Sequence, residues 1–226
     1  MAGSVLDDDP MIVRYRELGV GVEDVGMGKR PALLVVDFQR AFTEGLLASE
    51  HTDAALATTV ELLGFAREIG LPVIFVHVVY ESEEEIGAVW RAKGHRMVEC
   101  VRGRDGAEID PRVAPRPGEL VLEKKRASAF YGTGLDEVLE RLGIDSFVVC
   151  GTSTSGCVRA TVVDGAARDY RITVVADATD DRDPKSREAT LVDVQAKYGD
   201  VVSLADAIAK LRSALGQGGA ANQANE

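Results

Sequence analysis

Cys157 is the side chain of this sequence that is best suited to nucleophilic chemistry. It follows an apolar run, residues 146–150, and a stretch of glycine, serine and threonine, and it opens a helix-like segment, residues 157–169. This order predicts a strand, a tight loop and a helix N-terminus that carries the thiol. Backbone N–H groups and the helix dipole favour negative charge at such a position, and the thiolate is the nucleophilic form of cysteine. The segment predicts a thiol that tends to ionise, and a covalent hydrolase is the leading interpretation.

Two charged residues at the ends of other predicted strands could act with this thiol. Asp37 interrupts the apolar run 32–38, and Lys124 directly follows the short predicted strand at residues 120–123. A carboxylate can move protons to and from a reacting group, and a nearby cation stabilises a thiolate. Backbone N–H groups of residues 153–157 are suited to hold the oxyanion of a tetrahedral intermediate. Taken singly, each residue also has a structural interpretation: a helix cap, a solvated lysine and a small core cysteine.

Segments of strand length alternate with segments of helical periodicity along the chain. Continuous apolar runs indicate strands that are buried on both faces, and we expect strands at residues 32–38, 73–79, 120–123, 146–150, 172–176 and 201–202. We expect helices at residues 11–18, 52–69, 135–142, 157–169, 186–198 and from 203 onward, with Thr52 or Asp53 as the N-cap of the second. The alternation predicts an α/β protein with a mainly parallel six-stranded sheet and helices on both faces. Ligands bind beyond the carboxyl ends of such strands, where Asp37 and Cys157 both fall.

The chain divides into three predicted parts. Residues 1–30 are polar and punctuated by glycine, and they indicate an N-terminal arm. Residues 31–214 form one hydrolase domain, because no linker interrupts them. Residues 215–226 indicate a flexible tail. Within the domain, residues 81–118 form a long irregular connection, and such connections are often functional.

Composition narrows the class of protein. The 226 residues carry a net charge of −11, which disfavours nucleic acid as a partner. No apolar run has the roughly 20 residues of a membrane span, and the N-terminus lacks the pattern of a signal peptide, so we expect a cytoplasmic protein. Cys150 is expected in the core and Cys100 has no neighbour that would activate it. A redox enzyme is disfavoured because no second cysteine lies at Cys-x-x-Cys spacing.

Three blocks of the sequence resemble the signature blocks of the isochorismatase-like cysteine hydrolases. They read LLVVDFQ at residues 33–39, KKRASAFYGT at residues 124–133 and GTSTSGCVRAT at residues 151–161. The resemblance implies a Rossmann-like three-layer sandwich with Asp37, Lys124 and Cys157 as a catalytic triad. It also implies a cis peptide bond between Thr152 and Ser153, an oxyanion hole formed by the N–H groups of Ser153 and Cys157, and a homo-oligomer, either a dimer or a tetramer.

Further segments resemble the N-carbamoylsarcosine amidase and maleamate amidohydrolase branch of this family. They include YRELGVG at residues 15–21 and QAKYGD at residues 195–200. In this branch an arginine after the fifth strand often holds a substrate carboxylate, and Arg182 matches that position. Trp90 and Tyr131 are further candidates for lining the substrate pocket.

The resemblance therefore implies an amidohydrolase that releases ammonia from a small linear amide. An N-carbamoyl amino acid such as N-carbamoylsarcosine is the first candidate substrate, and a maleamate-like or biuret-like amide is the alternative. A catalytically silent binding or assembly protein of the same fold is the alternative from another class. No cofactor or metal is expected, because the histidine set of the metal-binding nicotinamidase branch is absent and no nucleotide-binding glycine loop follows a strand.

Overall fold

The computed structural model describes residues 4–221 and contains one six-stranded sheet in which every strand is parallel to its neighbours. The strand order is β3-β2-β1-β4-β5-β6. The strands are β1 (Pro31–Val36), β2 (Val73–Val78), β3 (Leu120–Lys124), β4 (Ser146–Thr152), β5 (Arg171–Asp180) and β6 (Asp200–Val202). The expected α/β architecture is confirmed, and the sheet is wholly parallel.

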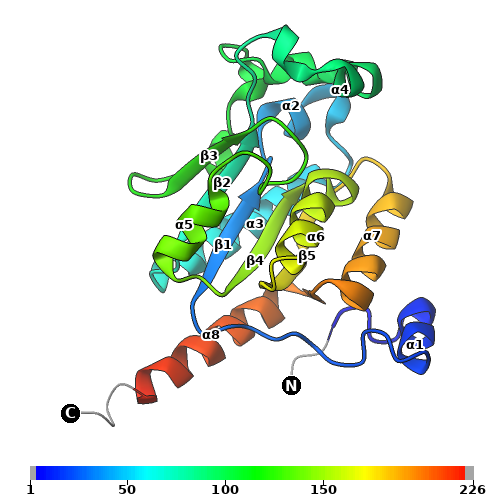
Figure 1. Ribbon diagram of the computed structural model, residues 1–226, viewed down its shortest axis with the longest axis vertical. Coiled ribbons are helices and arrows are strands. Elements are labelled where there is room, and N and C mark those ends of the chain that lie inside the picture. Colours follow the sequence, from blue (N-terminus) through cyan, green and yellow to red (C-terminus); the bar gives the residue numbers. More distant parts are fainter. Residues whose placement is uncertain (1–3, 222–226) are drawn as a thin grey trace.

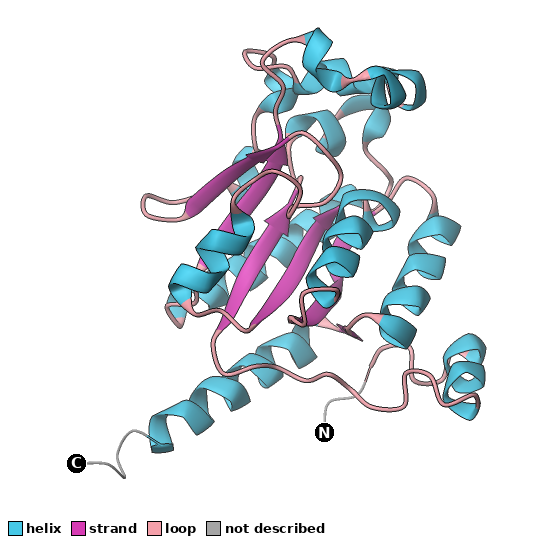
Figure 2. Ribbon diagram, viewed as in Figure 1, coloured by secondary structure: helices cyan, strands magenta, loops and turns pink. Residues whose placement is uncertain are grey.

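Helices cover both faces of the sheet and complete a three-layer sandwich (Figures 1 and 2). One face packs against α3 (Thr52–Glu68) and α8 (Leu204–Ala221). The opposite face packs against α5 (Leu135–Leu142), α6 (Arg159–Ala166) and α7 (Pro184–Lys197). Strand β1 is buried throughout because alternate side chains enter the two cores: Leu33 and Val35 on the α3 side, Leu34 and Val36 on the α6 side.

The sheet reverses its direction of growth between β1 and β4. The chain builds outward from β1 through β2 to β3, and then returns to place β4 on the other side of β1. Gly151 permits the close approach there, because a Cβ atom at this position would lie 2.0 Å from the Val36 carbonyl oxygen and its φ is +137°. Ligand sites of open α/β sheets lie at the carboxyl end of such a switch point.

The connection between β2 and β3 forms a cap over the carboxyl ends of the strands (Figure 1). It contains α4 (Ala88–Lys93) and four 3₁₀ turns, Glu83–Ile86, His95–Cys100, Asp105–Ala107 and Pro111–Val113. The cap packs on the short helix α2 (Arg40–Thr43) and the turn Gly45–Leu47 around an apolar cluster that includes Phe42, Tyr80 and Met97. We refer to residues 81–118 as the cap.

Gln39 fastens the cap to the sheet. Its buried side-chain amide accepts from Val78 N at 2.7 Å, and it donates to the carbonyl oxygens of Val78 at 3.0 Å and Gly106 at 2.9 Å. Three satisfied hydrogen bonds on one buried amide hold the ends of β1 and β2 and the cap in one arrangement.

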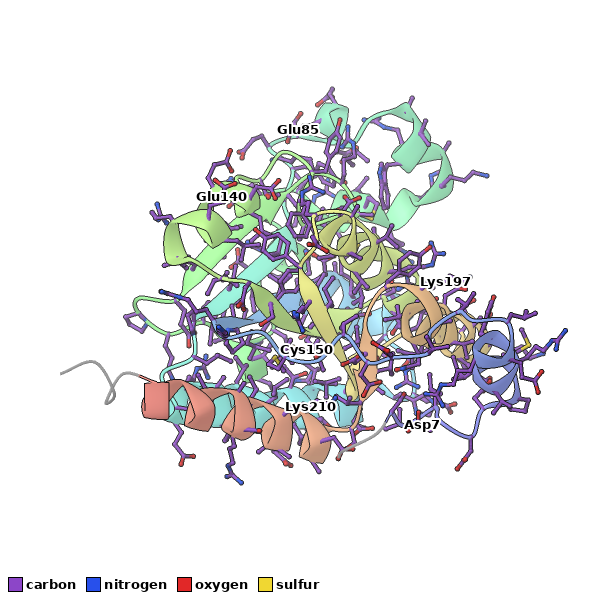
Figure 3. All side chains as sticks on the ribbon, turned by 60° about the horizontal axis from the view of Figure 1, so that its bottom comes forward. Asp7, Glu85, Glu140, Cys150, Lys197 and Lys210 are labelled. Atoms are coloured by element: carbon purple, nitrogen blue, oxygen red, sulfur yellow. The ribbon has the colours of Figure 1, made fainter. Side chains whose placement is uncertain are left out.

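The chain outside the sandwich lies along its base. Helix α1 (Pro10–Glu17) packs beside α7, and Asp200 accepts from the N–H groups of Val25 and Gly26. Lys210 of α8 pairs with Asp24 and Asp200 at this base (Figure 3). Helix α8 extends to Ala221, beyond the predicted start of the tail at residue 215, and residues 222–226 lie outside the described structure. None of the helices between residues 4 and 221 is long and apolar enough to cross a membrane.

The start of α3 differs from the expected one. His51 occupies the N-cap position without a side-chain cap. The Thr52 hydroxyl instead donates to Asp180 Oδ2 at 2.6 Å, and Ser49 donates to Oδ1 of the same carboxylate at 2.5 Å. The Thr52 hydroxyl therefore joins the start of α3 to the end of β5. The local sequence pattern around Thr52 does not reveal this long-range contact.

Candidate active site

Asp37 and Lys124 form a fully buried ion pair at the carboxyl edge of the sheet. Lys124 ends β3 and Asp37 follows β1, so the lysine reaches across the end of β2 to donate to Asp37 Oδ2 at 2.7 Å. Both side chains are 0% exposed. Burial alone would lower the pKa of the Lys124 ammonium, but the charge of the adjacent Asp37 carboxylate and the interaction with Cys157 together outweigh it, and the net pKa is raised. The Lys124 ammonium is therefore held in its charged form.

The backbone of Asp37 is held in an uncommon conformation. Its φ is +53°, in the left-handed region that non-glycine residues seldom occupy. The Asp37 N–H donates to the Val76 carbonyl at 2.8 Å, which ties the turn to β2. The second carboxylate oxygen, Oδ1, is buried and has no hydrogen-bond partner in the described part of the chain. Oδ1 is thus available to take a proton from a neighbouring group.

The thiol of Cys157 is the group that neighbours Asp37, and it interacts with both Asp37 and Lys124. It lies within a π-helical turn, Thr154–Val158, that precedes α6, and its side chain is buried. Burial raises the pKa of the thiol to about 12; the negative charge of Asp37 adds to this effect and Lys124 opposes it. The expectation of a thiol that ionises at a helix N-terminus was therefore wrong. Desolvation and the carboxylate outweigh the helix end, and the resting thiol is neutral.

The loop between β4 and Cys157 has the expected cis peptide bond, between Thr152 and Ser153. Two contacts from the end of β5 hold the loop: Ser155 N donates to Asp181 Oδ2 at 2.6 Å, and the Thr154 hydroxyl donates to the Asp180 carbonyl at 2.9 Å. Neither contact uses the N–H of Ser153 or Cys157. These two N–H groups remain the candidates for the oxyanion hole.

The three predicted substrate-binding residues differ in their placement. Arg182 is exposed, and its Nη2 donates to the Ser153 hydroxyl at 3.2 Å, which brings its guanidinium beside the loop. Trp90 is partly buried against the apolar cluster of the cap. Tyr131 is 67% exposed on the segment that follows β3. The structure brings Arg182 to the site, and the substrate-binding roles of all three stay predictions.

The other two cysteines are buried. Burial raises the pKa of Cys150 to about 12, and this residue lies in β4 in the middle of the sheet (Figure 3). Cys100 also has a pKa raised to about 12, chiefly by burial and then by the charge of Asp37. Gln39 Nε2 donates to its sulfur at 3.4 Å. Cys100 therefore lies near the triad in surroundings that disfavour its thiolate form.

Sequence reasoning missed Gln39, Asp181 and the position of Cys100. Gln39 lies three residues after the end of β1, and Asp181 directly follows β5. Polar residues near strand ends were a signal that could have found them. Nothing in the neighbourhood of Cys100 in the sequence points to the triad, because the cap folds back over it. Within residues 4–221, the structure groups no three His, Cys, Asp or Glu side chains as ligands for a metal ion.

The chain is similar to known proteins in both sequence and fold. The isochorismatase domain family matches residues 31–206. The maleamate amidohydrolase of Pseudomonas putida is 37% identical over 211 residues, which cover 92% of this chain and 99% of that protein. The N-carbamoylsarcosine amidase of an Arthrobacter species is 32% identical over 201 residues, covering 85% of this chain and 75% of that protein. The crystal structure of N-carbamoylsarcosine amidase from Thermoplasma acidophilum superposes with a TM-score of 0.66 at 35% identity, and covers 77% of this chain and 96% of that one.

Proposed function

The chain belongs to the isochorismatase family, and we propose that it is a cysteine-dependent amidohydrolase that cleaves the C–N bond of a small linear amide. The observation that carries this proposal is the juxtaposition of Asp37, Lys124 and Cys157 at the switch point of the sheet. Relatives with the names maleamate amidohydrolase and N-carbamoylsarcosine amidase support the reaction class.

Acylation begins with a neutral thiol. Asp37 Oδ1 takes the Cys157 proton while the sulfur attacks the amide carbonyl, because a thiol with so high a pKa does not ionise beforehand. Lys124 keeps its proton and stabilises the negative charge as it moves from Asp37 to the sulfur and the substrate oxygen. The N–H groups of Ser153 and Cys157 hold the oxyanion of the tetrahedral intermediate.

Collapse of the intermediate breaks the C–N bond. Asp37 returns the proton to the departing nitrogen, ammonia leaves, and the acyl group remains on Cys157 as a thioester. A water molecule then attacks the thioester while Asp37 takes one of its protons. That proton returns to the Cys157 sulfur as the C–S bond breaks, the product leaves as the carboxylic acid and loses its remaining proton to solvent, and the resting state is restored.

The substrate we propose is a short amide that carries a carboxylate. A maleamate-type monoamide is the first candidate, because the maleamate amidohydrolase shares more identity with this chain, over more of both proteins, than the N-carbamoylsarcosine amidase does. N-carbamoyl amino acids, which the sequence alone favoured, come second. Arg182 beside Ser153 is suited to hold the carboxylate. We also propose a homo-oligomer, which light scattering in solution would test.

An ammonia-release screen over maleamate, N-carbamoylsarcosine, biuret and nicotinamide tests the proposal. We expect turnover of one of the first two, and its loss in Cys157→Ala. Cys150→Ala is the matched control, because it removes a buried thiol that lies away from the triad. Turnover that survives in Cys157→Ala would refute cysteine catalysis. No turnover of any amide would favour the catalytically silent binding protein.

A further inference from the structure

Arg126 lies two residues after Lys124 and is tied to the triad through its backbone. Lys124 Nζ donates to the Arg126 carbonyl oxygen at 3.1 Å, in addition to its bond with Asp37. The main chain at Arg126 is therefore fixed by the same ammonium that polarises the site.

The guanidinium of Arg126 lies between the sheet and the cap. Its Nη1 donates to the Lys125 carbonyl at 2.6 Å, and the buried Tyr80 hydroxyl donates to the same oxygen at 3.2 Å. Its Nη2 lies 3.3 Å from the position that a Cβ atom of Gly87 would occupy, directly before α4. The group is thus adjacent to Tyr80 and to the helix that carries Trp90.

Tyr80 links this guanidinium to the triad. Burial raises the pKa of the Tyr80 phenol to about 12, the Cys100 sulfur adds to the rise, and the positive charges of Arg126 and Lys124 oppose it. Cys157 acts on the same phenol. One buried ring is therefore within electrostatic range of Arg126, Lys124 and Cys157.

Arg126 has no carboxylate partner in the part of the chain that the structure describes, unlike several arginines of the cap. Arg102, Arg104 and Arg112 each form ion pairs with acidic side chains. The half-buried Arg126 guanidinium has five N–H donors, and the structure uses one of them, on a neutral carbonyl. A partly desolvated cation without a counter-ion is costly, and a planar fork of donors suits a carboxylate.

We propose that Arg126 binds the carboxylate of the substrate and gives the enzyme its selectivity for anionic amides. This inference rests on the proposed amidohydrolase function and deepens it. Arg126 follows β3 and Arg182 follows β5, so the two residues lie at the carboxyl edge of the sheet on opposite sides of β1, the strand that precedes Asp37. Arg126 has the larger effect, because Arg182 is exposed and ion pairs in water are weak.

The selectivity of the enzyme for maleamate over maleamide tests this role. Maleamide is the uncharged diamide, in which a carboxamide replaces the single carboxylate of maleamate. In Arg126→Gln we expect the ratio of kcat/KM for maleamate to that for maleamide to fall by about 10- to 100-fold, mainly through KM. Arg126→Lys should recover part of the loss. Lys125→Gln is the matched control, since this lysine pairs with Glu85, and it should keep the wild-type ratio.

A ratio in Arg126→Gln within about twofold of wild type would overturn the inference, as would a wild-type preference for maleamide. Calorimetry on Cys157→Ala measures binding without turnover and so separates this inference from the proposed function. We expect maleamate to bind Cys157→Ala at least about tenfold more tightly than the double variant Cys157→Ala/Arg126→Gln. Equal affinities, or no binding, would overturn the inference even if the wild-type enzyme releases ammonia.

Discussion

Lys124 donates a 2.7 Å hydrogen bond to Asp37 across the end of an intervening strand, and neither side chain is exposed to solvent. Breaking a buried ion pair on one side is strongly destabilising, because it leaves an uncompensated charge, whereas replacing both partners by apolar groups is often tolerated. The pair is thus better explained by the chemistry of the adjacent Cys157 than by stability.

The first prediction separates these two roles of the pair. Lys124→Met should lower the free energy of unfolding by about 3–5 kcal/mol and abolish ammonia release. The double variant Asp37→Leu/Lys124→Met should regain most of the stability in urea denaturation and none of the activity. Lys197→Met, which breaks the exposed pair with Asp193, is the control and should cost less than about 1 kcal/mol. A double variant as unstable as Lys124→Met would show that the pair is needed for folding.

The second prediction follows from the raised pKa of the Cys157 thiol, about 12. The reactive thiolate fraction should rise about tenfold per pH unit below that pKa. Alkylation of Cys157 by iodoacetamide, followed by peptide mass spectrometry in the absence of substrate, should therefore accelerate from pH 7 to pH 10 without a plateau. Turnover should not follow this curve, because Asp37 removes the proton during attack. A midpoint near pH 8.5 with a plateau by about pH 9.5 would show that the thiol ionises like an ordinary cysteine.

The third prediction concerns the close approach of β1 and β4. Gly151→Ala places a methyl group 2.0 Å from the Val36 carbonyl, so the strands must separate beside Asp37. We expect a loss of about 2–4 kcal/mol in stability and a lower kcat. Gly64→Ala is the control, because a Cβ atom there has no neighbour within 4 Å and lies in the exposed part of α3. That change should be neutral or stabilise by up to about 1 kcal/mol, and equal effects of the two substitutions would contradict the packing argument.

The fourth prediction concerns the loop that carries the proposed oxyanion donors. Asp181 accepts from Ser155 N at 2.6 Å, so Asp181→Ala should loosen the loop and lower kcat by about 10- to 100-fold with little change in KM. Asp181→Asn keeps an acceptor oxygen and should retain most of the activity. The control, Asp183→Ala, removes the N-cap of α7 and should cost about 1 kcal/mol of stability with kcat preserved. If the alanine and asparagine variants behave alike, Asp181 does not act by holding this N–H.

Much of the fold could be predicted from the sequence because its signals are local. Apolar runs such as residues 32–36 identify buried strands, and their alternation with helical segments implies a parallel sheet. The positions of Asp37 and Lys124 at strand ends were sufficient to bring them to one edge. The cis peptide bond before Ser153 was predicted from the resemblance of one sequence block to a known family.

The parts that could not be predicted depend on contacts between distant segments. The neutral state of the Cys157 thiol follows from its burial beside Asp37, and a local pattern of small residues before a helix points the other way. The surroundings of Arg126 depend on the fold of the cap, which places Tyr80 and Gly87 around its guanidinium. Thr52 has the sequence context of a helix cap, yet its hydroxyl binds Asp180, 128 residues away.

The central claim is that Cys157 attacks the amide and carries the acyl group. The most direct measurement is mass spectrometry of the enzyme after acid quench during turnover of maleamate or the best amide of the screen. We predict an acyl adduct on the peptide that contains Cys157, formed with the release of ammonia and removed by hydroxylamine, as expected for a thioester. The claim would be contradicted if the active enzyme never carried this adduct and the Cys157→Ala variant turned over the amide at the wild-type rate.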